Sequence, residues 1–330
     1  EKADGSGRPQ RIDVDIGRPL AMTVSPKGVD RAAIANQRQE VLIVDLKTGA
    51  LTKVEASAHN RIGGMSWSPD GRWLAYGIHV TQEAASIHLY DTQRKKVHKV
   101  TRPDFVDFSP SFDPDGKYLY FLSHRVFDPV YDNQYFDLGF PRGVKPCLVT
   151  LAKDTPSPFS AANREPKPIV GGGNNQKKKG DDGAVTIHVA GIEDRVLAFP
   201  VGEQRYTRIA GAKGRALFSH LPVEGFLDQG NWASGGGPPA KQVLQSHVFD
   251  SGKTETVING VSGFAATADG AAMLVRVGNR LRALSTTITS KEVPGKGDVG
   301  RHSGWLDIER LRVEVDPGLE WGQMFDEAWR

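Results

Sequence analysis

The residues of this sequence that could do chemistry are few and widely separated. A hydrolase nucleophile elbow needs Gly-x-Ser-x-Gly, and none occurs in the 330 residues. The nine histidines show no zinc-protease spacing and no companion cysteine pair. Cys147, the single cysteine, stands at an apolar run, so we expect a buried, inert thiol. The sequence therefore predicts no catalytic residue, no metal site and no cofactor in this chain.

Two glycine-rich segments match the letters of nucleotide-binding motifs but lack their structural context. Residues 295–300 spell Gly-Lys-Gly-Asp-Val-Gly, yet residues 301–305 contain no helix start. Gly252-Lys253-Thr254 resembles the end of a phosphate loop, but His247 stands where the first glycine is required. We expect a loop at the first segment and a hairpin turn at the second.

Charged clusters also favour structural roles. Forty-two basic and 39 acidic side chains give a net charge of +3, which offers no electrostatic case for nucleic acid. Residues 181–182, both Asp, offset the lysines at 177–179. Four aspartates lack the spacing of a calcium loop, and we expect them to cap turns: Asp104, Asp107, Asp113 and Asp115.

The sequence contains no signal for a membrane or for export. No apolar run approaches 18 residues, and residues 1–10 are polar, without an initiator Met or a signal peptide. A single cysteine fits a reducing compartment. We expect a cytoplasmic protein, and a chain that is a piece of something longer.

A recurring turn organises the chain. Pro26 and Pro69 are 43 residues apart, and Pro69 and Pro114 are 45. Proline presets the early turn position and glycine supplies a positive φ at the last, so we expect positive φ at Gly71 and Gly116. The turns are Ser25-Pro26-Lys27-Gly28, Ser68-Pro69-Asp70-Gly71, Asp113-Pro114-Asp115-Gly116 and Thr267-Ala268-Asp269-Gly270.

Each turn is followed by apolar runs of strand length. The second strand after the turn ends at an aspartate, such as Asp45 or Asp91. A short polar strand follows that aspartate. Four strands in about 45 residues are typical of a β-propeller blade. We therefore predict an all-β propeller of four-stranded blades, five to six of them evident, with a β-sandwich as the alternative.

One unit carries a long aromatic insertion between its second and third strands. Residues 123–145 are too rich in aromatic side chains for a free loop, so we expect the insertion at one mouth of the propeller or against a neighbouring domain. They are the candidates for a substrate channel or an interface: Tyr131, Tyr135, Phe136 and Phe140. Residues 171–183 and 231–239 are predicted to be flexible loops.

The end of the chain changes character. Residues 311–315 alternate like a strand, then Asp316 and Pro317 provide the start of a helix that we expect to run to Arg330. Its apolar stripe at i, i+3, i+4 and i+7 predicts docking onto protein absent from this chain. The stripe consists of Trp321, Met324, Phe325 and Ala328.

Several stretches resemble the tricorn protease family of self-compartmentalising serine peptidases. They are residues 131–159, 191–201, 205–209 and 311–330. The resemblance implies a propeller that is seven-bladed in the parent protein and that admits unfolded peptides or oligopeptides as a channel or gate. It further implies a nucleophilic serine and its histidine beyond Arg330, downstream catalytic domains as partners, and a homo-oligomeric parent.

These observations give a plan of three segments. Residues 1–17 form an edge strand or the remnant of a preceding blade, 18–310 the propeller, and 311–330 a strand–helix connection into a catalytic region. Two alternatives to the peptidase propeller stay open. One is a stand-alone interaction propeller of the TolB or WD40 kind, and the other is the propeller cap of a prolyl-oligopeptidase-like enzyme.

Overall fold

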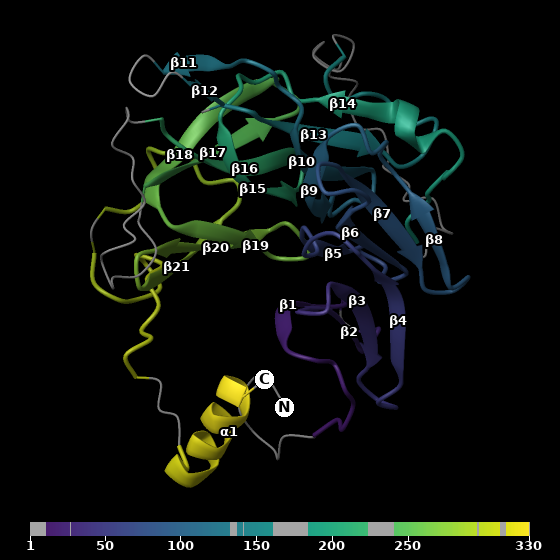
Figure 1. Cartoon of the computed structure of the whole chain (residues 1–330). Helices are drawn as coiled ribbons and strands as arrows, with labels where there is room; N and C mark the ends of the chain where they lie inside the picture. The colour runs from purple at the N-terminus through teal and green to yellow at the C-terminus, as the bar shows by residue number, and fades with distance from the viewer. Residues whose placement is uncertain are drawn as a thin grey trace, which may run out of the picture.

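The fold is an arc of small antiparallel sheets, each the blade of a propeller (Figure 1). The computed structural model describes residues 11–26, 28–132, 137–140, 142–160, 184–223, 241–295, 297–310 and 315–329. Within these ranges five blades follow one another around a common centre, with the first strand of each blade innermost. The predicted all-β propeller is confirmed.

The first two blades each contain four antiparallel strands in sequence order. Blade 1 consists of β1 (Pro19–Val24), β2 (Arg31–Asn36), β3 (Glu40–Asp45) and β4 (Leu51–Ala56). Blade 2 consists of β5 (Met65–Trp67), β6 (Trp73–His79), β7 (Ala85–Asp91) and β8 (Lys96–Lys99). Asp45 and Asp91 end the third strand of their blades, as predicted.

Blade 3 carries the predicted insertion as a separate hairpin. The blade consists of β9 (Val106–Phe112), β10 (Tyr118–His124), β13 (Val144–Thr150) and β14 (Val196–Ala198). The hairpin consists of β11 (Val130–Asp132) and β12 (Asp137–Gly139). A 3-10 helix, η2 (Ile192–Arg195), precedes β14. Blades 2 and 3 share one parallel pair, Ala85 with Val106.

The last two blades follow in sequence order. Blade 4 consists of β15 (Arg205–Ala212), β16 (Arg215–Leu221), β17 (Gln242–Val248) and β18 (Lys253–Val261). Blade 5 consists of β19 (Gly263–Ala266), β20 (Ala272–Val277) and β21 (Arg280–Ser285), and Arg282 forms a single bridge with Trp305.

The hydrophobic core lies between the blades. One cluster joins Ala33 and Val41 of blade 1 to Leu74 and Tyr76 of blade 2, and similar clusters join each later blade to its neighbour. A four-stranded sheet covered on both faces needs apolar residues at successive positions, which explains the buried run from Tyr118 to Leu122 in β10. Each blade therefore depends on its neighbours for stability.

The recurring turn has the predicted geometry. Gly71 and Gly116 both have φ of 68°, which confirms the positive φ expected of each. In all four turns the first side-chain oxygen accepts a hydrogen bond, 2.9–3.1 Å long, from a backbone N–H four to six residues later. The acceptors are Ser25, Ser68, Asp113 and Thr267. This bond ties each turn to the strand that leaves it.

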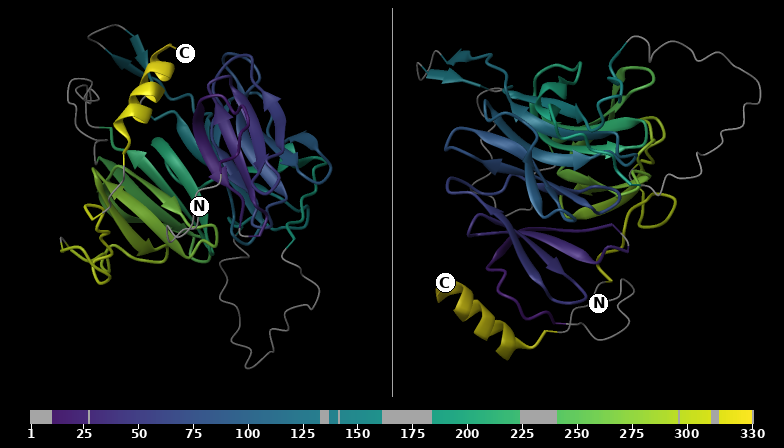
Figure 2. Two further views of the ribbon diagram at one scale, coloured as in Figure 1. Left: turned by 90° about the horizontal axis from the view of Figure 1, so that it is seen from below. Right: turned by 90° about the vertical axis from the view of Figure 1, so that its right-hand side faces the viewer.

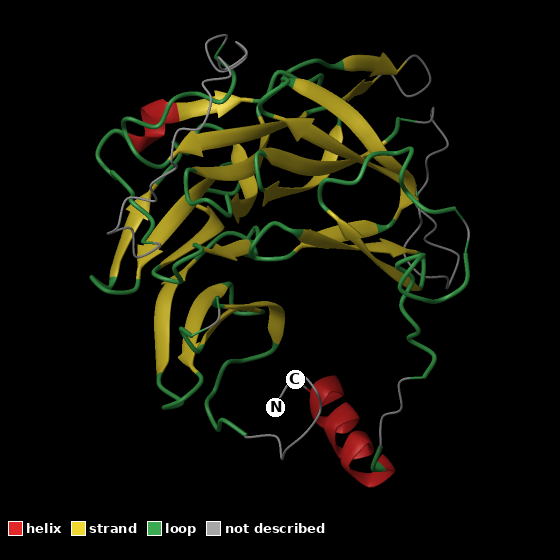
Figure 3. Ribbon diagram, turned by 180° about the vertical axis from the view of Figure 1, so that it is seen from behind, coloured by secondary structure: helices red, strands yellow, loops and turns green. Residues whose placement is uncertain are grey.

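Two apolar elements project from the same face of the blades. In both views of Figure 2 the β11–β12 hairpin and the C-terminal helix α1 (Pro317–Trp329) lie on one side of the arc. Figure 3 shows α1 apart from the sheets. Asp316 caps it by accepting the Gly318 N–H at 2.9 Å, so the predicted helix start is confirmed. The strand expected before it falls largely on residues 311–314, outside the described ranges.

The segment before blade 1 packs on the outside of that blade. Ile12, Val14 and Ile16 contact the cluster formed by β2 and β3. Residues 11–17 contain no strand, and Asn36 holds them by donating a side-chain hydrogen bond to the Ile16 carbonyl at 2.9 Å.

Candidate functional site: the central cavity

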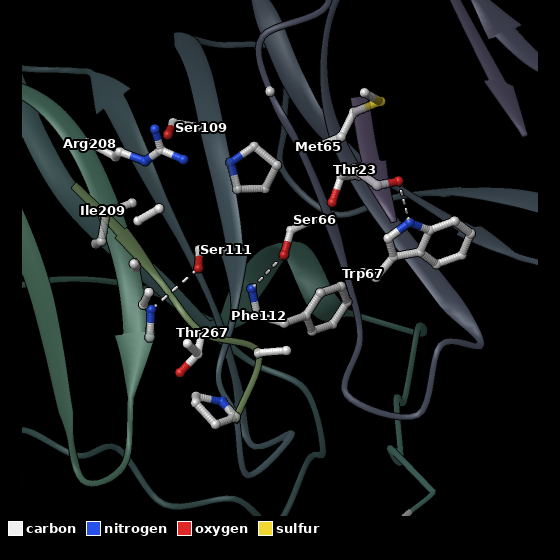
Figure 4. Close-up of a pocket in the computed structure, with 18 of the residues that line it drawn as sticks. Thr23, Met65, Ser66, Trp67, Ser109, Ser111, Phe112, Arg208, Ile209 and Thr267 are labelled. Carbon is white, nitrogen blue, oxygen red and sulfur yellow. Dashed lines mark hydrogen bonds between the residues drawn. The ribbon is translucent and has the colours of Figure 1, made fainter. Parts of the chain in front are cut away.

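The innermost strands enclose a cavity of about 680 Å³ at the centre of the arc. All five blades contribute to its wall, through residues 21–26, 64–67, 109–112, 207–211 and 265–268 (Figure 4). Consecutive inner strands contact one another in the order β1, β5, β9, β15 and β19. The cavity volume is within the range of ligand-binding pockets.

The wall of this cavity combines small residues, hydroxyls and a few apolar side chains. Among the described residues that line it, Arg208 is the one ionisable side chain, and neither Asp nor Glu is present. Burial lowers the pKa of Arg208, because the protein around the guanidinium withdraws it from bulk water even though it is exposed to the cavity. The wall is therefore polar and carries one positive charge.

In blades 2 and 3 a serine two residues before the turn ties the inner strand to that of the next blade. Ser66 Oγ accepts the backbone N–H of Phe112 at 3.1 Å, and Ser111 Oγ accepts that of Gly211 at 3.3 Å (Figure 4). The inner strand of a blade has an unpaired edge, so these hydroxyls satisfy N–H groups that the sheets leave free. They hold the cavity wall in one arrangement.

In blades 1 and 5, the two ends of the arc, the position two residues before the turn is not a serine. Thr23 stands there in blade 1, and its carbonyl oxygen accepts the Trp67 Nε1–H at 3.2 Å. Ala265 stands there in blade 5 and offers no hydroxyl. The arrangement of serine bonds is therefore specific to the contacts of blade 2 with blade 3 and of blade 3 with blade 4.

Two inner strands contain β-bulges on the cavity wall. In β9 an extra residue lies between Phe108 and Ser111, and Ser109 has φ of 54°. In β15 Thr207 is the extra residue, inserted before Arg208. Bulges turn side chains out of the regular alternation and are common beside functional sites.

Asp113 replaces, in blade 3, the hydroxyl residue of the other turns. Its carboxylate accepts the Lys117 N–H at 3.1 Å and the Tyr120 hydroxyl at 3.1 Å. Burial raises the pKa of the Asp113 carboxyl to about 6, and the nearby Asp115 adds to the rise. Asp113 is 3% exposed, so this is a structural group without access to a substrate.

A polar triad of half-buried Glu55 with buried Tyr76 and His88 joins blades 1 and 2 away from the cavity. The Glu55 carboxylate accepts the Tyr76 hydroxyl at 2.6 Å and lies 2.9 Å from His88 Nδ1. Burial would raise the pKa of Glu55, but the hydrogen bonds from His88 and Tyr76 outweigh it and lower the pKa. His88 is 3% exposed, so this triad is a structural contact between the two blades.

The structure separates the predicted aromatic candidates from the cavity. Tyr131 and Phe140 are exposed on the β11–β12 hairpin and do not line the cavity; Tyr135 and Phe136 lie outside the described residues. Phe127 joins the same apolar surface, its ring centroid 5.3 Å from that of Phe140. We call this exposed surface, with Val130 and Leu138, the hairpin patch.

The helix candidates are also exposed. Trp321, Met324 and Phe325 are between 66% and 71% exposed, and no described side chain of α1 is buried. Leu319 and Trp329 extend the apolar surface. We call this surface the helix patch.

Other sequence predictions have mixed outcomes. Cys147 is buried, and burial raises its pKa to about 12, so the inert thiol is confirmed. Gly252 lies in the predicted hairpin turn, between β17 and β18. The turn-capping role of Asp107 is wrong: it is buried in β9 and accepts hydrogen bonds from Ser123 and Arg125.

Among the described residues that line the cavity there is no His, Cys, Asp or Glu. Within the described ranges, no group of three His, Cys, Asp or Glu side chains could hold a metal ion. In the same ranges, no helix has the length and apolar character needed to cross a membrane.

The sequence prediction missed the residues of the cavity wall. Ser66 and Ser111 could have been found, because they hold the same place relative to the recurring turn. Arg208 could not, because blade 4 lacks the four-residue turn motif and a bulge sets the direction of this side chain.

The fold and the site define a β-propeller with a central cavity. Residues 1–287 match the tricorn protease second beta propeller domain. The chain belongs to that family. This finding favours the peptidase propeller over the stand-alone and prolyl-oligopeptidase alternatives.

Curated relatives and a solved structure agree with this assignment. The chain is 34% identical to tricorn protease homolog 1 of Streptomyces coelicolor over 96% of its length, and 32% identical to the tricorn protease homolog of Saccharolobus solfataricus over 98%. It spans 29% and 28% of those proteins. A crystal structure titled as the tricorn protease superposes with a TM-score of 0.77 over 98% of this chain and 29% of that one, at 24% identity, which supports the fold.

Proposed function

We propose that this propeller admits peptides through its central cavity to the catalytic part of a tricorn-type serine peptidase. The observation that carries the proposal is the cavity of about 680 Å³ lined by the inner strands of all five described blades. Its wall of hydroxyls, backbone and small side chains suits an extended peptide, because such groups pair with any peptide backbone. The family membership supplies the peptidase class.

The proposal assigns the bond-breaking residues to other parts of the parent protein. Covalent peptide hydrolysis needs a nucleophile and a base within hydrogen-bond reach, and the described cavity wall contains no histidine or cysteine. We expect the hairpin patch and the helix patch to contact those other parts. A cytoplasmic location belongs to the proposal because a single cysteine fits a reducing compartment. A homo-oligomeric parent belongs to it through the family resemblance alone.

Blocking the cavity in the complete peptidase tests the proposal. Ala265→Cys places a thiol on an exposed position of the wall, while Cys147 is buried and slow to react. Labelling with a bulky maleimide should reduce turnover of long unfolded peptides at least tenfold. Glu255→Cys on β18 (Lys253–Val261), away from the cavity, is the matched control and should lose little activity.

The unsubstituted peptidase, treated with the same reagent, controls for thiols elsewhere in the protein. If labelled Ala265→Cys and labelled Glu255→Cys degrade long peptides at the same rate, peptides do not pass through this cavity.

A further inference from the structure

The direction of Arg208 is set by a local interruption of its strand. Tyr206 pairs with His220 and Arg208 pairs with Ser219, so Thr207 is an extra residue in β15. Tyr206 is buried, whereas Thr207 and Arg208 are both exposed, which breaks the alternation of a regular strand. The bulge thus brings two consecutive side chains to the cavity side.

Thr207 and Arg208 differ in what they contact. The Thr207 hydroxyl lies 2.9 Å from Ser219 Oγ and donates to Gln242 Oε1 at 2.8 Å, so it is engaged within blade 4. Arg208 has no hydrogen bond or ion pair with the side chains of the described residues. Figure 4 shows its guanidinium extending from β15 toward the space between the inner strands.

The surroundings of Arg208 favour an anion. No described residue of the cavity wall is acidic, so its charge meets no compensating carboxylate there. A guanidinium that the cavity wall partly withdraws from bulk water interacts with an anion more strongly than one on the outer surface does, because water and salt screen it less. Its planar donors match the two oxygens of a carboxylate.

We propose that Arg208 is a carboxylate-binding position inside the channel, so that the propeller favours peptides carrying a free C-terminus or acidic side chains. The inference rests on the proposed function, since it names the class of peptide that the same cavity prefers. The bulge at Thr207 serves this role by turning the guanidinium from the sheet into the path of the peptide. The strained wall residue Ser109, on the neighbouring strand β9, belongs to the same functional surface.

Binding of three fluorescent peptides to the full chain tests this inference. The first peptide has a free C-terminus and no acidic side chain, the second has a C-terminal amide and one Glu, and the third has a C-terminal amide and no acid. Arg208→Gln should weaken binding of the first or second peptide, or both, about tenfold, which corresponds to one charge-assisted hydrogen bond. It should leave the third unchanged.

Two further variants make the result specific. Arg208→Lys keeps the charge but not the paired planar donors, so it should retain only part of the preference. Arg94→Gln removes an exposed arginine outside the cavity and should change nothing. If Arg208→Gln weakens binding of the first peptide alone, the ligand is a C-terminal carboxylate. If it weakens binding of the second peptide alone, the ligand is an acidic side chain.

The outcomes separate this inference from the proposed function. The label on Ala265→Cys could prevent binding of all three peptides while the Arg208→Gln variant binds them as the native chain does. In that case the proposed channel is supported and the carboxylate-binding role of Arg208 is wrong. If the label blocks none of them, the channel itself is wrong. If the native chain binds the first and second peptides, which carry a carboxylate, no more tightly than the third, the inference is overturned directly.

Discussion

The cavity wall and the two apolar patches use their side chains in opposite ways. On the wall, inner strands are bonded to one another by Ser66 and Ser111, and their apolar residues pack between blades. On the hairpin and helix patches, large apolar side chains such as Phe127 and Trp329 are 80% and 85% exposed. The blades therefore cover one another's apolar side chains, whereas the apolar side chains of the two patches are left exposed. Exposed apolar surface of this kind usually marks an interface.

The largest expected difference between the core and the patches concerns two tryptophans. Trp73 is 3% exposed in a core cluster, and Trp321 is 71% exposed on α1. Trp73→Ala should lower the free energy of unfolding of the chain by roughly 3–5 kcal/mol. Trp321→Ala should change it by less than about 0.5 kcal/mol. Chemical denaturation measures both, and a large loss with Trp321→Ala would break the comparison.

Asp113 should make the stability of the wall depend on pH. Its pKa is raised to about 6 in the folded chain, from an ordinary value of 3.8. Below the ordinary value the carboxyl is protonated in both states, and as pH rises through about 6 the folded state loses stability, by on the order of 3 kcal/mol at most. Asp113→Asn should remove this decline between about pH 4 and pH 7. An unchanged pH profile of unfolding would contradict the assignment.

Glycines at the turns separate backbone strain from crowding. Gly71 has φ of 68°, and a Cβ there would lie 2.6 Å from Val29 Cγ2; Gly214 has φ of 69° with open space around it. Gly71→Val should destabilise the chain by roughly 1–3 kcal/mol, and Gly214→Val by less, since only strain acts there. Gly202→Ala, which meets neither obstacle, is the control in thermal denaturation. Equal melting temperatures for all three would refute the turn geometry.

The serine bonds should have the smallest measurable effect on the wall. Ser66→Ala leaves the Phe112 N–H without its acceptor and should cost about 1 kcal/mol of unfolding free energy. Thr256→Ala, on the exposed part of β18, should cost less than about 0.5 kcal/mol. If the two substitutions prove equivalent, the serine does not contribute to holding the wall.

The blades could be predicted from sequence because their signals are local. The recurring turn places proline, aspartate and glycine within four residues, and Gly71 and Gly116 have the backbone geometry that this chemistry requires. The helix start at Asp316 is local in the same sense. In contrast, Arg208 reaches the cavity through a bulge, and the cavity arises from five segments far apart in the chain. No short pattern encodes either feature.

No local sequence pattern identifies what contacts the hairpin patch or the helix patch. The aromatic content of residues 123–145 predicted an interface, and the structure shows Tyr131 and Phe140 exposed. Their exposure does not identify an occupant, so docking stays a proposal.

Solvent access to Trp321 tests most directly the claim that this propeller is one part of a larger peptidase. Acrylamide quenching of its fluorescence is measured in the 330-residue chain and in the complete peptidase, each with Trp321→Phe as the reference that isolates its signal. We expect strong quenching in the chain, where this side chain is 71% exposed, and protection in the complete protein. Burial of such a ring contributes on the order of 1.5–3 kcal/mol, enough to hold a helix of this length in place. Equal quenching in both proteins would contradict the account.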